Sequence, residues 1–391
     1  MLVLKNARVL PELTVGCQGD RADIVIEGER IVEVLPAGEG AGKDVVDVEG
    51  RLLLPGLIDA HVHLDLCGMS TWEENEQPDT LRVLRGVSLA KASLKKGFTT
   101  LRDCGDRNNI IIDLARAIKE GYIEGPDILA AGMIITPTES GNEYFKGMYA
   151  ESDGRDEIAK NVRKQIQRGA DWIKYMGTGA VMNPGGEPGS PVYTEEEVNA
   201  LCIAASLRGI PVVCHAHGTD GMIYAINNGV RTIEHASMVT DEVVELLLKK
   251  EHTYIVPTLT PSARWFEAEE DYPQHYIEKA RKIFDMEVES VKKAYEAGIK
   301  IGLGSDAGVY ANSHGDNSFE LKARVKYTGL KPIDVLIQAT KTNAEMLMIE
   351  DQVGTIQTGK KANLVIIDGN PVENIMDIDN VVMVIKDGKI V

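Results

Sequence analysis

Residues 54–64, LPGLIDAHVHL, form an apolar run that carries two histidines two residues apart near its end. Side chains at positions i and i+2 of a strand point the same way, so the imidazoles of His61 and His63 should face one side. Similar strand-like runs follow along the chain, and they are GFTTLRDCG (97–105), DILAAGMIIT (127–136), DWIKYMG (171–177), PVVCHAHG (211–218), TIEHAS (232–237), TYIVPTL (253–259) and KIGLGSD (300–306). Between most of them lie helix-like stretches rich in Ala, Leu, Lys and Glu. Eight such β–α units are typical of a (β/α)₈ barrel.

The two ends of the chain have a different pattern. Residues 1–56 alternate apolar and polar residues over short runs, as expected for strands with one wet face. Residues 346–391 repeat this pattern, with Asp-Gly turns at Asp368 and Asp387. We therefore predict an α/β protein in which a (β/α)₈ barrel, residues 57–345, is joined to a small β-sandwich domain that both termini build.

The composition of the 391 residues narrows the class of protein. The formal net charge of −18 gives an acidic surface that repels phosphate backbones, so we expect no nucleic-acid partner. No apolar run approaches the ~18 residues of a membrane span, and no segment has the apolar character of a secretory signal. The five cysteines form no C-x-x-C pair, which argues against a disulfide framework or a thiolate zinc site. We expect a cytoplasmic protein that does not bind membranes.

Metal-binding types of side chain gather where the predicted barrel strands end. His215 and His217 are again two residues apart, His235 ends the next strand, Asp306 ends the last one, and Lys174 lies in an apolar strand. Barrel enzymes carry their active sites at the carboxyl ends of the strands, so these residues should converge. A single histidine on a strand is usually structural. Here five of only eight histidines fall at three strand ends, which favours a metal site.

These motifs, together with IKYMGTGAVMNPG (173–185) and the C-terminal segment from residue 339 onward, resemble the amidohydrolase superfamily over nearly the whole chain. Within it the chain is most similar to the branch of Xaa-Pro dipeptidase-like and carboxypeptidase-like enzymes, which is related to imidazolonepropionase-like and ochratoxin-hydrolysing enzymes. The resemblance implies two divalent metal ions. His61, His63 and Asp306 would hold the more buried ion, His215 and His235 would hold the other, and Lys174, carboxylated on Nζ, would bridge them.

The implied chemistry is consistent with the residue types. Burial of a charged lysine is costly, and the neutral amine of Lys174 can react with CO₂ to give an anionic carbamate. The alternative is a lysine whose ammonium reaches solvent at the strand end. Two ions ~3.5–4 Å apart can share a hydroxide that attacks a carbonyl carbon, and Asp306 would carry its proton to the leaving amine. Imidazoles and carboxylates favour Zn²⁺, with Mn²⁺ or Co²⁺ as alternatives.

The resemblance implies a small-molecule substrate with an amide or peptide bond, such as a dipeptide or an N-acyl amino acid. His217 would contact the substrate's terminal carboxylate. Asn142 stands near the place where many relatives carry a histidine, and an amide cannot titrate. Further residues near predicted strand ends are candidate substrate contacts, and they are Arg102, Tyr175, Arg264 and His314.

Other reactions remain open at this stage. The same site could act on a lactone, a cyclic amide, a phosphotriester or another C–N bond, and fold analogy does not separate these. A non-catalytic relative is a further alternative, but such proteins usually lose ligands, and all six are present here. Relatives of this type also lead us to expect a homo-oligomer.

Overall fold

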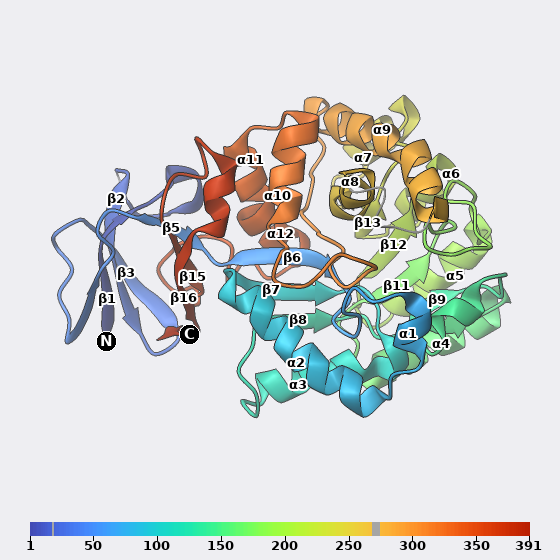
Figure 1. Cartoon of the computed structure of the whole chain (residues 1–391), viewed down its shortest axis with the longest axis horizontal. Helices are drawn as coiled ribbons and strands as arrows, with labels where there is room; N and C mark the ends of the chain where they lie inside the picture. The colour runs from blue at the N-terminus through green and yellow to red at the C-terminus, as the bar shows by residue number, and fades with distance from the viewer. Residues whose placement is uncertain (18, 268–273) are drawn as a thin grey trace.

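The computed structural model describes residues 1–17, 19–267 and 274–391. Parallel strands form a barrel with helices around it (Figure 1). The barrel strands are β6 (Leu57–Val62), β7 (Phe98–Asp103), β8 (Asp127–Ala130), β9 (Ile134–Thr136), β11 (Ile173–Met176), β12 (Val212–Ala216), β13 (Thr232–His235) and β14 (Tyr254–Val256). The predicted third strand is thus divided into β8 and β9, and a short strand, β10 (Tyr149–Glu151), pairs with β9.

Residues 300–307 close the barrel between β14 and β6. Ile301 forms a parallel bridge with Ile255, and Ala307 forms one with Val62. The Ala60 N–H also donates to the carbonyl oxygen of Leu303 at 2.9 Å. On the far side, the Asp171 N–H donates to the Ala130 carbonyl at 2.9 Å and links β8 to the start of β11. The predicted α/β barrel is therefore confirmed.

Helices follow the strands and cover the outside of the barrel (Figure 1). Thr194 caps α5 with a reciprocal hydrogen-bond pair to Glu197, and Gly169 ends α4 in the left-handed conformation. The helices are α1 (Thr71–Asn75), α2 (Asp79–Lys95), α3 (Ile110–Lys119), α4 (Gly154–Arg168), α5 (Glu195–Ser206), α6 (Thr219–Asn227), α7 (Asp241–Lys249), α8 (Leu259–Glu267), α9 (Gln274–Glu296), α10 (Phe319–Ala323), α11 (Pro332–Ile337) and α12 (Asn343–Met346). Single 3₁₀ or π turns lie at Pro11–Leu13, Arg107–Asn109, Asn142–Phe145, Arg324–Thr328, Gln338–Thr342 and Ile375–Asp379. None of the described helices is long and apolar enough to cross a bilayer.

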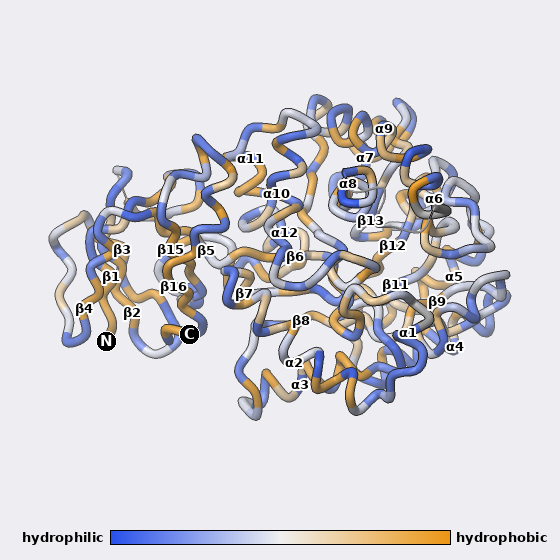
Figure 2. The backbone as a smooth tube through the Cα atoms, viewed as in Figure 1, coloured by the Kyte–Doolittle hydropathy of each residue, from blue (hydrophilic) through white to orange (hydrophobic). Residues whose placement is uncertain are grey.

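A second sheet draws its strands from both ends of the chain, which lie close together in Figure 1. Its strand order is β17-β16-β15-β5-β1-β2-β3, with β4 paired to β1. Its strands are β1 (Leu2–Arg8), β2 (Arg21–Glu27), β3 (Arg30–Pro36), β4 (Asp44–Asp47), β5 (Leu52–Pro55), β15 (Leu364–Ile367), β16 (Val381–Lys386) and β17 (Lys389–Ile390). The predicted Asp387-Gly388 turn joins β16 to β17, and both residues have positive φ. Figure 2 shows the strands of this sheet as largely hydrophobic, and their apolar side chains form a separate core cluster.

Ion pairs join this sheet to the bottom of the barrel. Asp127, the first residue of β8, accepts from Lys361 Nζ and from Lys386 Nζ, each at 3.2 Å. These contacts lie at the opposite end of the strands from the predicted site, so they hold the sheet without contacting that site. The division of the chain into a barrel of residues 57–345 and a terminal domain of residues 1–56 and 346–391 stays a prediction.

Candidate active site

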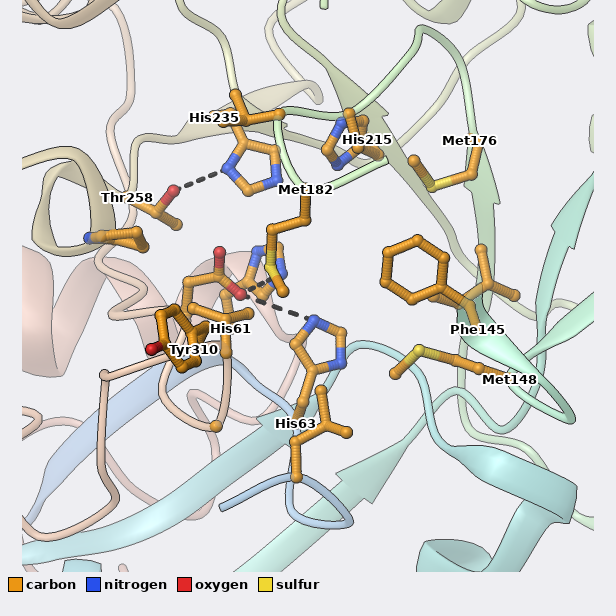
Figure 3. Close-up of a pocket in the computed structure, with 18 of the residues that line it drawn as sticks. His61, His63, Phe145, Met148, Met176, Met182, His215, His235, Thr258 and Tyr310 are labelled. Atoms are coloured by element: carbon orange, nitrogen blue, oxygen red, sulfur yellow. Dashed lines mark hydrogen bonds and ion pairs between the residues drawn. The ribbon is translucent and has the colours of Figure 1, made fainter. Parts of the chain in front are cut away.

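The six side chains predicted to bind metal line one pocket at the carboxyl end of the barrel strands (Figure 3). Asp306 Oδ1 lies 3.5 Å from Nε2 of His61 and 3.5 Å from Nε2 of His63. The ring centroids of His215 and His235 are 4.4 Å apart. Strands far apart in the sequence thus bring the whole set together: His61, His63, Lys174, His215, His235 and Asp306.

Hydrogen bonds to Nδ1 fix the orientation of two of the rings. His61 Nδ1 lies 2.7 Å from Glu234 Oε2, and His63 Nδ1 lies 2.7 Å from the Gly105 carbonyl oxygen. Both contacts leave Nε2 directed at the pocket. Burial lowers the pKa of His61 to about 3 and the pKa of His63 to about 4. The rings are therefore neutral, as metal-binding imidazoles must be.

The backbone is unusual at two of the predicted ligands. His235 has φ 68° and Asp306 has φ 57°, a left-handed conformation that is uncommon for residues other than glycine. Such strain persists where the surroundings enforce it, and it is concentrated at functional sites. His235 Nδ1 is held 2.6 Å from Thr258 Oγ1, as Figure 3 shows. The strained turns direct both side chains into the pocket rather than along the strand.

Three polar atoms of this set have no hydrogen-bond partner in the described chain. They are Lys174 Nζ, His215 Nε2 and Asp306 Oδ1, and all three residues are buried. Buried polar atoms almost always have a partner. Nitrogen and oxygen donors that converge without partners fit divalent metal ions. Among the described residues, three groups of possible ligand atoms have members within 4.8 Å of one another: His61, His235 and Asp306; His215, His217 and His235; and His61, Cys104 and Glu234.

Below the ligands lies a buried ion pair that the sequence analysis did not predict as such. Arg102, a candidate substrate contact, is fully buried and donates to Glu234 Oε1 at 2.8 Å and to the Ala60 carbonyl at 2.6 Å. Its guanidinium lies 4.8 Å from the centre of the Trp172 ring. Arg102 therefore lies inside the barrel, away from the substrate, and Glu234 connects it to His61. The only sign of this ion pair in the local sequence is an acidic residue, Glu234, directly before His235.

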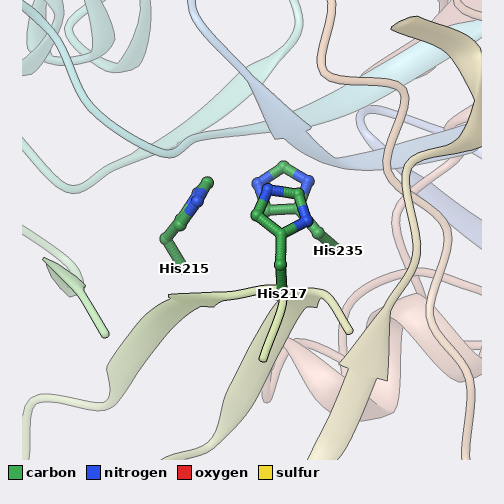
Figure 4. A group of neighbouring side chains, drawn as sticks. All are labelled: His215, His217 and His235. Carbon is green, nitrogen blue, oxygen red and sulfur yellow. The ribbon is translucent and has the colours of Figure 1, made fainter. Parts of the chain in front are cut away.

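His217 is the one predicted substrate contact that lines the pocket. Its ring stacks on His235 with centroids 4.8 Å apart, and Figure 4 shows both rings beside His215. His217 Nδ1 lies 2.7 Å from Ser237 Oγ. Nε2 is therefore the ring nitrogen available to a bound molecule.

Tyr175 and Arg264 do not line the pocket. Lys174 and Met176 do, and because strand residues alternate, Tyr175 between them points outward into the core that α5 covers. Arg264 forms an ion pair with Asp316 and lies over the Phe319 ring. Neither side chain is positioned to contact a molecule bound at the six ligands.

Asn142 and His314 also lie outside the pocket lining. Asn142 Nδ2 donates to the Pro137 carbonyl and to Glu151 Oε1, each at 2.9 Å, so it stabilises its own loop. His314 Nε2 lies 3.0 Å from the His63 carbonyl oxygen. His314 thus supports the backbone of a ligand-bearing strand instead of contacting substrate.

Residues that were not predicted as site residues form the rest of the pocket. Figure 3 shows Phe145, Met148 and Met176 on one side of the histidines, and Met182 in the centre of the view. Met69 and Trp265 also line the pocket. Methionine side chains are flexible and polarizable, so this wall can adapt to apolar groups of different shape.

Comparison with known proteins agrees with this geometry. The model of the amidohydrolase family matches residues 52–391. Ochratoxinase from Aspergillus niger is 27% identical over 355 residues, which cover 83% of this chain and 72% of that protein. The structure of a Xaa-Pro dipeptidase with methionine bound in its active site is 32% identical, with a TM-score of 0.90, and the match covers 100% of this chain and 99% of the other. A prolidase in complex with N-methylphosphonate-L-proline is 30% identical, with a TM-score of 0.89 and the same coverage. The chain belongs to the amidohydrolase family and is a hydrolase that acts on amide bonds.

Proposed function

We propose that this protein is a dipeptidase or carboxypeptidase that uses two divalent metal ions and cleaves dipeptides and N-acyl amino acids. The observation that carries the proposal is the position of His217, a buried imidazole that follows β12 directly, two residues after the proposed ligand His215, and lines the same pocket. Assembly into a homo-oligomer stays a prediction.

Six donors of the right chemistry support two ions. His61, His63 and Asp306 would hold one, and His215 and His235 the other, with Zn²⁺ the best match to imidazole and carboxylate donors. Lys174 Nζ is buried without a partner, so an uncompensated ammonium there is costly. As a carbamate, Lys174 would offer two anionic oxygens to the ions. When bound, the ions would polarise the scissile carbonyl and make water a stronger nucleophile.

Asp306 is the residue best placed to move the proton. Its Oδ1 has no hydrogen-bond partner, and its backbone carbonyl accepts from Asn312 Nδ2 at 2.9 Å, which fixes the turn that carries it. A carboxylate in this position would take the proton from the attacking water and pass it to the leaving amine. General acid–base catalysis of this kind requires a group within hydrogen-bond reach of both atoms.

His217 would bind the substrate's terminal carboxylate. The ring centroids of His217 and His215 are 4.8 Å apart, so a carboxylate bound at His217 would lie beside the proposed metal ligands and close to the scissile carbonyl. Burial lowers the pKa of the His217 ring to about 3 in the free protein. A bound carboxylate would raise that pKa and favour the protonated ring, in which Nε2 donates to the anion. Remote binding of this anion would orient the carbonyl for attack. The wall of Phe145, Met148 and Met176 offers room for an apolar side chain.

The test is a matched pair of substrates, alanyl-methionine and its C-terminal amide, assayed with and without a metal chelator. Loss of the terminal charge should lower kcat/KM at least ~10-fold, since a charge-assisted hydrogen bond contributes ~1.5–3 kcal/mol. His217→Ala should remove most of this preference without changing the metal content, whereas the control His252→Ala, at an exposed position before β14, should not. Equal cleavage of acid and amide would refute the binding of the terminal carboxylate by His217. No cleavage of any dipeptide would refute the peptidase assignment and leave hydrolysis of another amide.

A further inference from the structure

One strand residue near the predicted metal ligands is a carboxylate that the proposed chemistry does not use. Asp59 lies in β6, two residues before His61, and is fully buried. It does not line the pocket, so it is not positioned to contact a substrate. Carboxylates are almost never fully buried unless they are paired. The hydrogen-bond partners of Asp59 therefore indicate what it does.

Four hydrogen bonds reach the carboxylate of Asp59, and each comes from a donor. Oδ1 accepts from the backbone N–H groups of His61 and Ser305, at 3.1 and 3.0 Å. Oδ2 accepts from Ser305 Oγ and from Asn317 Nδ2, at 2.5 and 2.7 Å. A carboxylate accepts on both oxygens, whereas an amide of the same shape donates from one end. An asparagine at this position could not satisfy all four donors.

The Ser305 backbone that Asp59 holds leads directly into Asp306, which has φ 57°. A residue other than glycine keeps this left-handed conformation only where its surroundings enforce it. The N–H groups on both sides are fixed by the same network: the Asp306 N–H donates to the His61 carbonyl at 2.8 Å, and the Ala307 N–H donates to Ser305 Oγ at 3.2 Å. The Ser305 side chain thus links Asp59 to the far side of the turn.

The carbonyl groups of the turn are also paired. Asn312 Nδ2 donates to the carbonyl oxygens of Ser305 and Asp306, at 2.8 and 2.9 Å. The Ala307 carbonyl accepts from the His63 N–H at 2.8 Å. Each backbone N–H and C=O of residues 305–307 therefore has a partner. A change of φ at Asp306 would break hydrogen bonds on one side of the turn.

We propose that Asp59 is a positioning residue, which holds Asp306 in its left-handed conformation through Ser305 and so directs the Asp306 carboxylate at His61 and His63. This rests on the proposed function, in which Asp306 binds a metal ion and carries the proton. Because one oxygen of Asp59 accepts from both His61 and Ser305, it fixes the spacing of the two segments that carry these ligands. A displacement of about 1 Å that originates far from the reacting atoms can lower a rate ~10²-fold.

An exchange of donor and acceptor between Asp59 and Asn317 tests this role. Asp59→Asn leaves at least one donor without its acceptor, whichever way the new amide faces. Asn317→Asp places two carboxylates against each other. The double variant, Asp59→Asn with Asn317→Asp, restores one donor and one acceptor and keeps the net charge. Each single variant should lower kcat for alanyl-methionine ~10–100-fold, and the double variant should recover most of it. KM should change little, because His217 lies outside this network.

Metal binding gives a second readout that does not depend on turnover, and Asp23 provides the matched control. Asp23 is also fully buried and accepts from three backbone N–H groups, but in the second sheet, from Asn6, Gly38 and Gly40. Asp59→Asn and Asp23→Asn should both lower the free energy of unfolding of the full chain. Only Asp59→Asn should raise the dissociation constant for Zn²⁺, by ~10–100-fold in competition with a chromophoric chelator.

The proposal is overturned if Asp59→Asn changes kcat and the Zn²⁺ dissociation constant no more than Asp23→Asn does, since Asp59 would then only stabilise the fold. A folded double variant that stays as impaired as the single variants overturns it as well. If the single variants do not fold, Ser305→Ala, which removes only the hydroxyl between Asp59 and Ala307, should give the same fall in kcat and metal affinity, and unchanged values would refute the proposal.

Failure of this inference and failure of the proposed function give different results. If the wild type cleaves dipeptides and Asp59→Asn cleaves them equally well, the positioning role is wrong and the peptidase assignment stands. If the wild type cleaves no dipeptide but Asp59→Asn still weakens Zn²⁺ binding and the double variant restores it, the substrate assignment is wrong and the positioning role stands.

Discussion

Replacing Glu234 by glutamine tests whether the buried network beneath the site keeps a metal ligand in its working tautomer. Glu234 is fully buried, Oε1 accepts from Arg102 Nη2 at 2.8 Å, and Oε2 lies 2.7 Å from His61 Nδ1. Glu234→Gln keeps the shape but places an NH₂ group opposite one of these donors. If the amide faces His61, that ring keeps a hydrogen bond only by moving its proton to Nε2, the atom that a metal ion needs.

Glu234→Gln should lower both the stability of the protein and its affinity for metal, for different reasons. Arg102 is fully buried, and removal of one partner of a buried ion pair costs about 3–5 kcal/mol, so the free energy of unfolding of the metal-free protein should fall by this amount. Loss of a residue that orients a metal-binding histidine typically weakens metal affinity or activity ~10–100-fold. The dissociation constant for the metal should therefore rise by the same factor.

Denaturant unfolding in the presence of chelator measures the first loss, and competition with a chromophoric chelator measures the second. The control is the double variant Arg102→Met with Glu234→Leu, because replacement of a whole buried ion pair by apolar residues is often close to neutral. Its stability should largely recover while metal binding stays weak, since His61 still lacks its partner. A Glu234→Gln variant within ~1 kcal/mol of wild type, with unchanged metal affinity, would refute this reasoning.

Three further predictions concern the ligands themselves. Elemental analysis of protein purified without chelator should find two divalent ions per chain, and one ion or none under metal-replete conditions would contradict the binuclear site. Lys174→Ala should lose most activity and recover part of it with a small added carboxylic acid, whereas Lys174→Arg should stay inactive because a guanidinium cannot form a carbamate; an active Arg variant would exclude Lys174 as a ligand. Asp306→Asn should lower kcat ~10²–10⁴-fold, the usual effect of general acid–base catalysis, and near-normal turnover would assign proton transfer to another group.

Most of the fold prediction came from the local periodicity of apolar residues. The runs around His61, Lys174 and His215 alternate or stay apolar over strand length, and each became a barrel strand in the predicted order. The closing segment, residues 300–307, is paired only through bridges and single hydrogen bonds, yet its apolar run was enough to identify it. The same periodicity could have excluded Tyr175 as a substrate contact, because its neighbour Lys174 had already been placed on the inner face.

Contacts between strands far apart in the sequence determine which hydrogen-bond partners the site residues have. His61 and Glu234 are 173 residues apart, and Arg102 and Glu234 are 132 residues apart, so no local pattern links them. Charged residues within strands are usually expected at a surface, and only barrel closure shows that this pair is enclosed. The sequence by itself therefore determined the order of the strands and which side chains end them, since both follow from hydrophobic periodicity along one strand. The tertiary structure alone decided which partners orient those side chains, since this depends on how strands far apart in the chain pack together.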